Sequence, residues 1–445
     1  MNNDVRDELS HLKRYSSIRS GKNVKFLTPA VYSGGWCPMR VACNICEDIE
    51  GMSYLIVGMP ECAIHSRRMT ALPEGDHGEL RRIYVLDANE VVFGCRKGLT
   101  DALREMDREG ARAILMIATC VTDLIGEDFE GLISEIQPEL SARLSFVTLG
   151  QFKNFGSPIG TWKTAEALAS MMSRKSTDSS RANVLFIEPW RNKNEPVKYP
   201  LIARALESCG VKIRRIAAGA RLDDYMNAAD AALNLALCSY AQPLAAKMEA
   251  AFGIPYAPLH NAYAVGEIDG AYNMIFCAFG AGCGCGDMSA LIGGWRDMAV
   301  RLEERARREL GGLRYAILPG VEMPGALAVY LAGFGMEPLI MHIEDFHQED
   351  AGYAKRLKAL GYDPPACRMM NIDRDIEIVL RLKPDICFGG MPDEVTGWPC
   401  AEDMGDFFGV TGYERTAVLL NRILTVLETG ENEKERIDMY GPAPL

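Results

Sequence analysis

The stretch DAALNLALC, residues 230–238, is an apolar run that ends in a cysteine, and it indicates the fold of the chain. Such a run is typical of a strand that is buried on both faces. Before it, apolar runs alternate with amphipathic segments. They predict a strand at 182–190, a helix at 197–210, a strand at 211–219 and a short helix at 221–229. Buried strands that alternate with helices predict parallel α/β sheets.

The same alternation extends in both directions along the chain. ARAILMIATC, residues 111–120, predicts another buried strand, and residues 313–390 alternate strand and helix in turn. Two segments are typical of domain boundaries: the Ser-rich residues 173–182, and a charged helix at 296–312 that ends in Gly-Gly. We therefore expect three α/β domains with doubly wound, Rossmann-like parallel sheets. Their predicted bounds are 1–172, 182–295 and 312–445.

Composition narrows the class of protein. The 445 residues leave room for about two to four domains, and the 48% hydrophobic content supports a sizeable core. A net charge of −12 argues against a nucleic-acid partner. The polar N-terminus lacks a signal-peptide core, and no run reaches the ~18 apolar residues of a membrane span. We therefore expect a cytoplasmic protein without a membrane partner, in which the 14 cysteines do not form disulfides.

Four cysteines lie where a ligand could bind. Cys120 and Cys238 each end a predicted strand, and open parallel sheets bind ligands beyond the carboxyl ends of their strands. Cys37 and Cys62 lie on predicted turns beside glycine and proline. Glycine allows the backbone to approach an inorganic cluster closely, and turn N–H groups can bond to cluster sulfides. At this point a plain buried thiol is the alternative for each cysteine.

The other cysteines carry weaker signals. Cys43 and Cys46 form a C-x-x-C inside a predicted helix, VACNICEDIEGM, residues 41–52, and we expect them to be structural thiols of the core. We expect the same of six further cysteines: Cys95, Cys209, Cys277, Cys367, Cys387 and Cys400. The phosphate loop G-x-x-x-x-G-K-[ST] does not occur in the sequence, and neither do G-x-S-x-G or HExxH. The chain is therefore not expected to hydrolyse ATP itself.

Five segments, in order, resemble the component-1 subunits of nitrogenase and nitrogenase-like reductases, and the resemblance covers nearly the whole chain. The first combines the turn cysteines Cys37 and Cys62 with Cys120 in ATCVTDLIGEDFEG. The others are EVVFGCRKGLTDAL (90–103), LNLALCSYAQPLAAKMEAAFGIPY (233–256), RLKPDICFGG (381–390) and TGYERTAVLLNRIL (411–424). The resemblance implies three domains of the component-1 type.

The resemblance also implies cofactors and partners. A homologous K-type chain would pair with this one in a heterodimer or heterotetramer. An iron–sulfur cluster, either an eight-iron P-cluster type or a 4Fe–4S type, would lie between the chains, with Cys37, Cys62 and Cys120 as metal ligands. A separate ATP-dependent iron protein with a 4Fe–4S cluster would deliver electrons. Cys238 matches the residue that binds the large Fe–S cofactor. Thiolates are the preferred ligands of such clusters.

Three departures argue against dinitrogen reduction. Thr411 occupies the place of the histidine that is the cofactor's second ligand in molybdenum-type subunits, and Thr161 falls near the family's histidine over the cofactor face. The usual Lys and His after the last strand are absent from residues 388–409. We therefore expect a large Fe–S cofactor without molybdenum. His347, His260 or Cys283 could serve as the second ligand of the cofactor in place of the missing histidine. Alternatively, the cofactor could have no second protein ligand.

These features favour a D-type catalytic subunit of a methylthio-alkane reductase, which would cleave C–S bonds of small methylthio-alkanes. One alternative is a scaffold subunit on which a nitrogenase cofactor precursor is assembled. The other is a tetrapyrrole reductase subunit, for protochlorophyllide or nickel-sirohydrochlorin, which would need no cysteine at position 238. Candidates for proton transfer are His260, His347 and Tyr263. Arg67 and Arg68 are expected to be structural.

Overall fold

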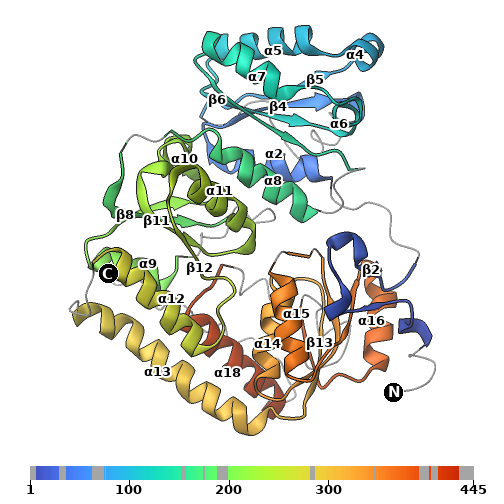
Figure 1. Ribbon diagram of the computed structural model, residues 1–445, viewed down its shortest axis with the longest axis vertical. Coiled ribbons are helices and arrows are strands. Elements are labelled where there is room, and N and C mark those ends of the chain that lie inside the picture. Colours follow the sequence, from blue (N-terminus) through green and yellow to red (C-terminus); the bar gives the residue numbers. More distant parts are fainter. Residues whose placement is uncertain are drawn as a thin grey trace. The chain divides into compact units, whose positions relative to one another are not determined.

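The chain folds as α/β with parallel sheets, which confirms the predicted class (Figure 1). The computed structural model describes residues 7–29, 37–62, 75, 77–151, 157–173, 176–187, 199–280, 286–344, 346–347, 349–389, 400–401 and 409–429. Two compact units are present. Unit 1 comprises Met1–Gly34, Lys198–Gly210 and Pro258–Leu445, and unit 2 comprises Gly35–Val197 and Val211–Ala257. The predicted division into three domains stays a prediction.

The first sheet of unit 2 has the strand order β5-β4-β6-β7, and each neighbouring pair is parallel. Its strands are β4 (Ser53–Gly58), β5 (Arg81–Val85), β6 (Ala113–Ala118) and β7 (Arg143–Thr148). The central strands β4 and β6 are buried along their whole length, as the apolar run at 111–120 predicts for β6. Because parallel neighbours end at the same edge of a sheet, the residues that follow β4 and β6 meet there.

Short helices connect these strands. They are α4 (Ala88–Phe93), α5 (Arg96–Arg108), α6 (Cys120–Ile125) and α7 (Phe129–Ile136). In α5, Leu99, Leu103 and Met106 recur at helical spacing and are buried in one apolar cluster with Leu132 of α7. The opposite face of α5 carries charged residues, so this helix covers the sheet with its apolar side only.

Helices α2 (Pro38–Glu47) and α8 (Ser157–Ala169) pack closely against each other in unit 2. At Gly160 of α8, a Cβ atom would lie 2.8 Å from the carbonyl oxygen of Pro38. Only glycine fits at this distance, because real Cβ contacts are longer. The close approach holds the start of α2 in place, and Cys37 lies directly before it.

The second sheet of unit 2 has the order β12-β11-β8-β9. Its strands are β8 (Asp178–Leu185), β9 (Lys212–Ile216), β11 (Ala231–Ala236) and β12 (Tyr256–Pro258), with β8 parallel to both β9 and β11. Asn183 and Asn234 face each other in register, and Asn183 Nδ2 donates to Asn234 Oδ1 at 2.8 Å in a fully buried position. A shifted register would leave these buried amides unpaired, so the pair specifies the alignment of β8 with β11.

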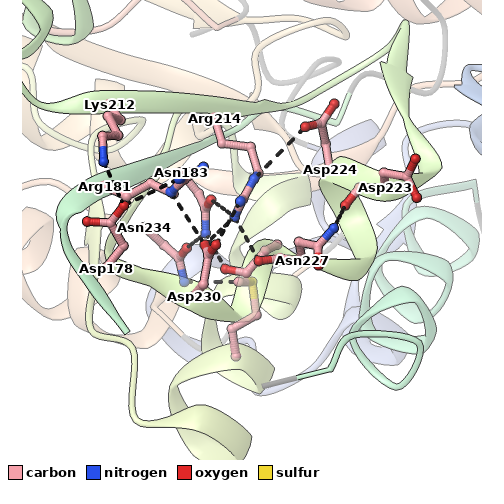
Figure 2. A network of polar contacts seen from close by, with 12 residues as sticks. Asp178, Arg181, Asn183, Lys212, Arg214, Asp223, Asp224, Asn227, Asp230 and Asn234 are labelled. Atoms are coloured by element: carbon pink, nitrogen blue, oxygen red, sulfur yellow. Dashed lines mark hydrogen bonds and ion pairs between the residues drawn. The ribbon is translucent and has the colours of Figure 1, made fainter. Parts of the chain in front are cut away.

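A polar network surrounds the amino ends of β8, β9 and β11 (Figure 2). Arg214 of β9 is buried and donates to Asp230 from Nη1 at 2.5 Å and from Nη2 at 3.0 Å. Nη1 also donates to the carbonyl of Asn227 at 2.8 Å. Asp178, at the start of β8, pairs with Lys212 at 3.2 Å. These charges stabilise the edge of the sheet opposite to the edge at which Cys238 lies.

The predicted bounds of the strand at 182–190 are wrong at both ends, because β8 spans Asp178–Leu185. It begins at Asp178 and so includes part of the Ser-rich segment that predicts a boundary, and it ends at Leu185 rather than at residue 190. The polar first half of β8 is only partly buried, and Asp178 bonds there to Ser180 and Lys212. Polar residues are therefore compatible with a strand at this edge of the sheet.

Unit 1 contains a larger sheet with the strand order β1-β15-β14-β13-β16-β17, in which β2 also pairs with β15. Its strands are β1 (Lys13–Arg14), β2 (Lys25–Phe26), β13 (Arg314–Ile317), β14 (Glu337–His342), β15 (Pro365–Arg368), β16 (Ile386–Phe388) and β17 (Cys400–Ala401). Among the strand pairs that the structure describes in this sheet, only β1 with β15 is antiparallel. The N-terminal segment thus joins a sheet whose other strands lie some 300 positions later, and the buried Tyr15 donates to Asp350 at 2.5 Å.

In the described part of unit 1, seven helices accompany this sheet. They are α9 (Leu201–Ser208), α12 (Val265–Ala278), α13 (Gly286–Glu309), α14 (Pro324–Ala332), α15 (Asp350–Ala359), α16 (Ile372–Arg381) and α18 (Tyr413–Thr429). The predicted charged helix at 296–312 is the second half of α13. Every residue of α14 is buried, which places this helix at the centre of the unit. Among the described residues, no helix combines the length and apolarity that a membrane crossing requires.

Candidate metal centre

Three of the predicted ligand cysteines lie at the carboxyl edge of the first sheet in unit 2. Cys120 begins α6 directly after β6, and Cys62 follows β4 by a few residues. Cys37 is the N-terminal cap residue of α2. Cys120 and Cys62 both lie near enough to Cys37 to contribute to the raised pKa of its thiol. Segments far apart in the sequence thus converge on one place.

Gly58, the last residue of β4, makes this convergence possible. A Cβ atom at Gly58 would lie 2.2 Å from Thr119 Oγ1 and 3.1 Å from Cys62 Sγ. Thr119 precedes Cys120, and its hydroxyl donates to the carbonyl of Val57 at 2.9 Å. The missing side chain at Gly58 therefore lets the residues before Cys120 and the thiol of Cys62 pack against the same strand end.

The surroundings of these thiols are suited to a cationic ligand. Burial raises the pKa of the Cys37 thiol, and the neighbouring Cys120 and Cys62 raise it further, while backbone N–H groups of Met39 and Arg40 act in the opposite direction. The backbone N–H of Gln151 contacts Cys120 Sγ at 3.4 Å. Three thiolates at close range repel one another, and metal coordination removes that repulsion. All three side chains are half-buried, so further ligands could approach them.

These thiols do not form a closed site for a single ion. Within the part of the chain that the structure describes, no group of three or more His, Cys, Asp or Glu side chains is placed to bind one metal ion. A structural zinc site would require four ligands around one ion. The cysteine set instead fits a multi-iron cluster, whose thiolate ligands bind different atoms.

Cys238 lies at the carboxyl edge of the second sheet, as the sequence predicts. It follows β11 and is completely buried. Its Sγ atom is 3.4 Å from both the N–H and the carbonyl oxygen of Ile187, a residue just after the neighbouring strand β8. Cys238 therefore lies on a different sheet from the other three cysteines, so the four do not make one site.

The predicted proton-transfer residues belong to unit 1. His260 is buried, and its carbonyl accepts from Arg415 Nη1 at 2.7 Å. The same guanidinium lies 3.9 Å from the ring centroid of Tyr263, so Arg415 contacts the backbone of His260 and the ring of Tyr263. His347 lies elsewhere in the unit, and burial lowers its pKa to about 4. It is neutral at pH 7, which makes it a poor proton donor there.

Both positions at which the resemblance expects a histidine carry a buried threonine. Thr161 lies in α8 and Thr411 lies just before α18. Each side chain is almost fully buried, and neither hydroxyl has a hydrogen-bond partner in the described part of the chain. Arg67, Arg68 and Cys283 lie outside the described residues.

The remaining described cysteines agree with a structural reading, with one exception. Cys43 and Cys46 are completely buried in α2, and burial raises the pKa of both thiols. Three more are buried and one is half-buried: Cys95, Cys367, Cys387 and Cys209. Cys277 is exposed, because it lies on the outer face near the end of α12. The side chain of Cys400 is outside the described residues.

Sequence reasoning missed an exposed apolar patch beside Cys120. The patch, as we define it, consists of Val92 and Phe93 of α4 with Leu124 and Ile125 of α6. Phe93 is 85% exposed, Val92 71% and Leu124 60%, and the two helices pack against each other. Large apolar side chains gathered on a surface mark an interaction site. The apolar run VVF inside the short segment 88–93 is a signal that could have indicated it.

Comparison with known proteins places the chain among relatives. Residues 37–428 match the family model described as nitrogenase component 1 type oxidoreductase. The nitrogenase iron-molybdenum cofactor biosynthesis protein NifE of Clostridium pasteurianum is 26% identical over 227 residues, which are 50% of this chain and 48% of the relative. The protein of the same name from Nostoc sp. (strain PCC 7120) is 24% identical over 331 residues, 70% of this chain and 64% of the relative. The chain thus matches about half to two-thirds of the length of these curated relatives.

Solved structures show the same fold. The structure "Nitrogenase Cp1 at pH 6.5" aligns with a TM-score of 0.66 over 94% of this chain and 97% of that chain, at 14% identity. The structure "Nitrogenase Cp1 at pH 5" aligns with a TM-score of 0.60 at 18% identity. At these identities the likeness concerns the fold alone.

Proposed function

This chain belongs to the nitrogenase component 1 type oxidoreductases, and on that basis we propose that it carries iron–sulfur clusters and takes part in assembling a nitrogenase-type cofactor. The observation that carries the cluster assignment is the convergence of Cys37, Cys62 and Cys120 from three separate segments. The similarity to NifE proteins supports the assembly role, which corresponds to the scaffold alternative of the sequence analysis.

In this proposal Cys37, Cys62 and Cys120 bind a cluster that a homologous second chain completes. Their half-buried thiols leave room for ligands from that chain. An iron–sulfur cluster supplies single-electron transfer at this position. The N–H groups of Met39, Arg40 and Gln151 support a negatively charged sulfur set, because N–H dipoles stabilise thiolate.

Cys238 would hold the cofactor precursor. Its position beyond the end of β11 is the edge at which open parallel sheets bind ligands. The small hydroxyl of Thr161, in place of a histidine, favours a precursor or a modified cluster over the complete molybdenum cofactor. This assignment is a proposal about Cys238 alone, because the second ligand is not identified.

The apolar patch would be the docking surface of an ATP-dependent iron protein. Phe93 of α4 and Leu124 of α6 both expose apolar side chains, and α6 is the helix that begins with Cys120. Electron transfer between proteins requires a close approach of donor and acceptor. A patch adjacent to a cluster ligand is therefore a suitable contact point.

Cluster transfer is the experiment that tests the assembly role. The chain would be purified without oxygen together with its second chain, and then incubated with a cofactor-deficient nitrogenase component 1. We expect the iron content of the complex to fall as the acceptor gains activity. A cluster that stays bound through the incubation and through turnover would contradict assembly.

Reductive cleavage of C–S bonds in small methylthio-alkanes is the second candidate. The apolar patch favours it, because repeated turnover depends on repeated docking of an electron donor. The same preparation, supplied with iron protein, ATP and reductant, would release methanethiol if this candidate is correct. A preparation with only about four irons and a bound pigment would instead favour a tetrapyrrole reductase.

Cysteine variants separate the two metal positions. We expect Cys238→Ala to remove the precursor and leave the electron paramagnetic resonance signal of the inter-subunit cluster. Cys37→Ala should remove that signal. Cys277→Ala, at an exposed thiol, is the matched control and should retain both. If Cys238→Ala and Cys37→Ala retain full iron content, the ligand assignment is wrong.

A further inference from the structure

Unit 1 contains a cavity of about 400 Å³ between helices α12, α13, α14 and α15. Arg307 of α13 and Arg356 of α15 both line it, and Tyr330 of α14 forms part of its wall. We call this cavity the arginine pocket. Its volume lies in the range of small-molecule sites. Its residues are separate from the four proposed ligand cysteines, Cys37, Cys62, Cys120 and Cys238, which belong to unit 2.

One wall of the arginine pocket is flat and apolar. Tyr330 stacks on Tyr263 with ring centroids 5.6 Å apart, and Tyr330 and Phe334 make a T-shaped contact with ring centroids 5.0 Å apart. The Tyr330 hydroxyl donates to Glu303 Oε1 at 3.2 Å, so the ring has a fixed orientation. A rigid aromatic wall favours a ligand that carries a flat apolar group.

The two carboxylates of the pocket already have partners. Glu303 accepts from the Val265 N–H at 3.0 Å, from Tyr330, and from Arg307 Nη2 at 3.0 Å. Glu267 accepts from Arg356 Nη2 at 2.9 Å and caps the first turn of α12. Little acceptor capacity is left for a cationic ligand.

The two arginines, in contrast, retain donor capacity. A guanidinium has five N–H groups, and among the described residues Arg307 and Arg356 each use one nitrogen for these carboxylates. Their side chains are 57% and 54% exposed. Each guanidinium is also positioned by an aromatic ring: Arg307 lies 5.9 Å from the centroid of Phe334, and Arg356 lies 6.0 Å from that of Tyr353. The free donors are thus held in place before a ligand arrives, which lowers the entropic cost of binding.

We propose that the arginine pocket binds a small carboxylate that carries a flat apolar group. The carboxylate receives hydrogen bonds from Arg307 and Arg356, and the apolar group lies against Tyr330 and Phe334. The site is independent of the cluster and cofactor assignments, so it stands or falls without them.

Calorimetric titration of the full-length protein with phenylacetate tests the proposal. We expect saturable binding at one site. Benzyl alcohol and phenethylamine, which keep the ring but lack the negative charge, should bind at least about ten-fold more weakly. No saturable binding of phenylacetate, or equal binding of benzyl alcohol, would overturn the proposal.

Variants locate the binding to this pocket. The double variant Arg307→Gln and Arg356→Gln should weaken phenylacetate binding at least about ten-fold. Arg308→Gln, at an exposed residue on the same helix that does not line the pocket, should bind as the unaltered protein does. Ala359→Trp, at an exposed rim position, should block binding by filling the pocket. Unchanged binding in the double variant or in Ala359→Trp would refute the assignment.

Discussion

Gly58 controls the position of Cys62 at the level of single residues. Its Cα lies where a side chain would collide with Thr119 Oγ1 at 2.2 Å and press on Cys62 Sγ at 3.1 Å. Thr119 cannot move freely, because its hydroxyl donates to the carbonyl of Val57 at 2.9 Å. The absence of a side chain at Gly58 therefore sets the packing of Thr119 and Cys62 at the end of β4.

We expect Gly58→Ala to lower cluster content and to destabilise the fold by about 1–3 kcal/mol, the usual cost of overpacking. Iron analysis after anaerobic purification and urea denaturation would measure the two effects. Gly266→Ala is the matched control, because no atom lies within 4 Å of the added Cβ. Equal iron content in Gly58→Ala and in the unaltered protein would show that Cys62 does not depend on this close contact.

Among the secondary-structure elements, helices α4 and α6 together form the apolar patch. A capping box between Asp87 and Glu90 fixes the start of α4, and Gly94 ends it. The helix is thus only six residues long, and its last two side chains, Val92 and Phe93, remain exposed. Their exposure reflects the length of the helix rather than an unfilled core.

Phe93→Ser should lower the rate of electron delivery from an iron protein at least about ten-fold, because it removes the most exposed apolar side chain of the patch. Thermal stability and iron content should stay unchanged, since the ring is not in the core. Stopped-flow oxidation of the iron protein would measure the rate. Met274→Ser, an exposed methionine of α12, is the control. An unaffected rate in Phe93→Ser would exclude the patch as the docking site.

The polar network at the amino ends of β8, β9 and β11 joins three secondary-structure elements through charged side chains. Asp230→Ala would remove the nearer carboxylate partner of the buried Arg214 guanidinium and leave it only the carboxylate of Asp224 at 4.0 Å. Breaking a buried ion pair in this way costs about 3–5 kcal/mol. Urea denaturation should show that loss, whereas Asp223→Ala removes an exposed contact with Arg112 and should cost less than about 1 kcal/mol. Equal stabilities of the two variants would contradict the role of the network.

The two compact units describe the organisation of the whole molecule. The chain passes from one unit to the other four times, so neither unit is one continuous segment. The N-terminal residues add β1 and β2 to the sheet of unit 1, although the sequence places them near the first cysteine. Each unit is therefore assembled from segments that are distant in the sequence.

Unit 1 also determines the response of stability to pH. Burial lowers the pKa of His342 to about 3 and that of His347 to about 4. The unfolded histidines bind protons near pH 6.5. The contribution of each neutral histidine to the stability of the fold is complete above pH 6.5. It is lost as the pH falls toward about 4 for His347 and about 3 for His342. Burial raises the pKa of Glu414 to about 7, so this single group acts in the opposite direction.

We therefore expect the free energy of unfolding to decrease between pH 6.5 and 4.5. Urea denaturation across this range would measure the slope. His342→Gln should reduce the slope by about 1.4 kcal/mol per pH unit, the contribution of one proton, and Glu414→Gln should make the slope steeper. A slope that is the same in all three proteins would contradict the assignment of these groups.

The sequence by itself determined the α/β class, the buried central strands and the positions of Cys120 and Cys238 after strands. These features follow from apolar periodicity, which is a property of neighbouring residues. The periodicity overestimated the C-terminal end of β8, missed its polar beginning, and predicted a structural thiol at Cys277, because the solvent exposure of a residue depends on distant segments.

Only the tertiary structure decided which residues meet. The approach of Cys37 to Cys62 and Cys120 depends on the pairing of β4 with β6 and on the packing of α2 against α8. The arginine pocket likewise depends on helices α12 to α15. Such convergence joins residues tens to hundreds of positions apart, and no local pattern encodes it, because the packing of whole elements brings those residues together.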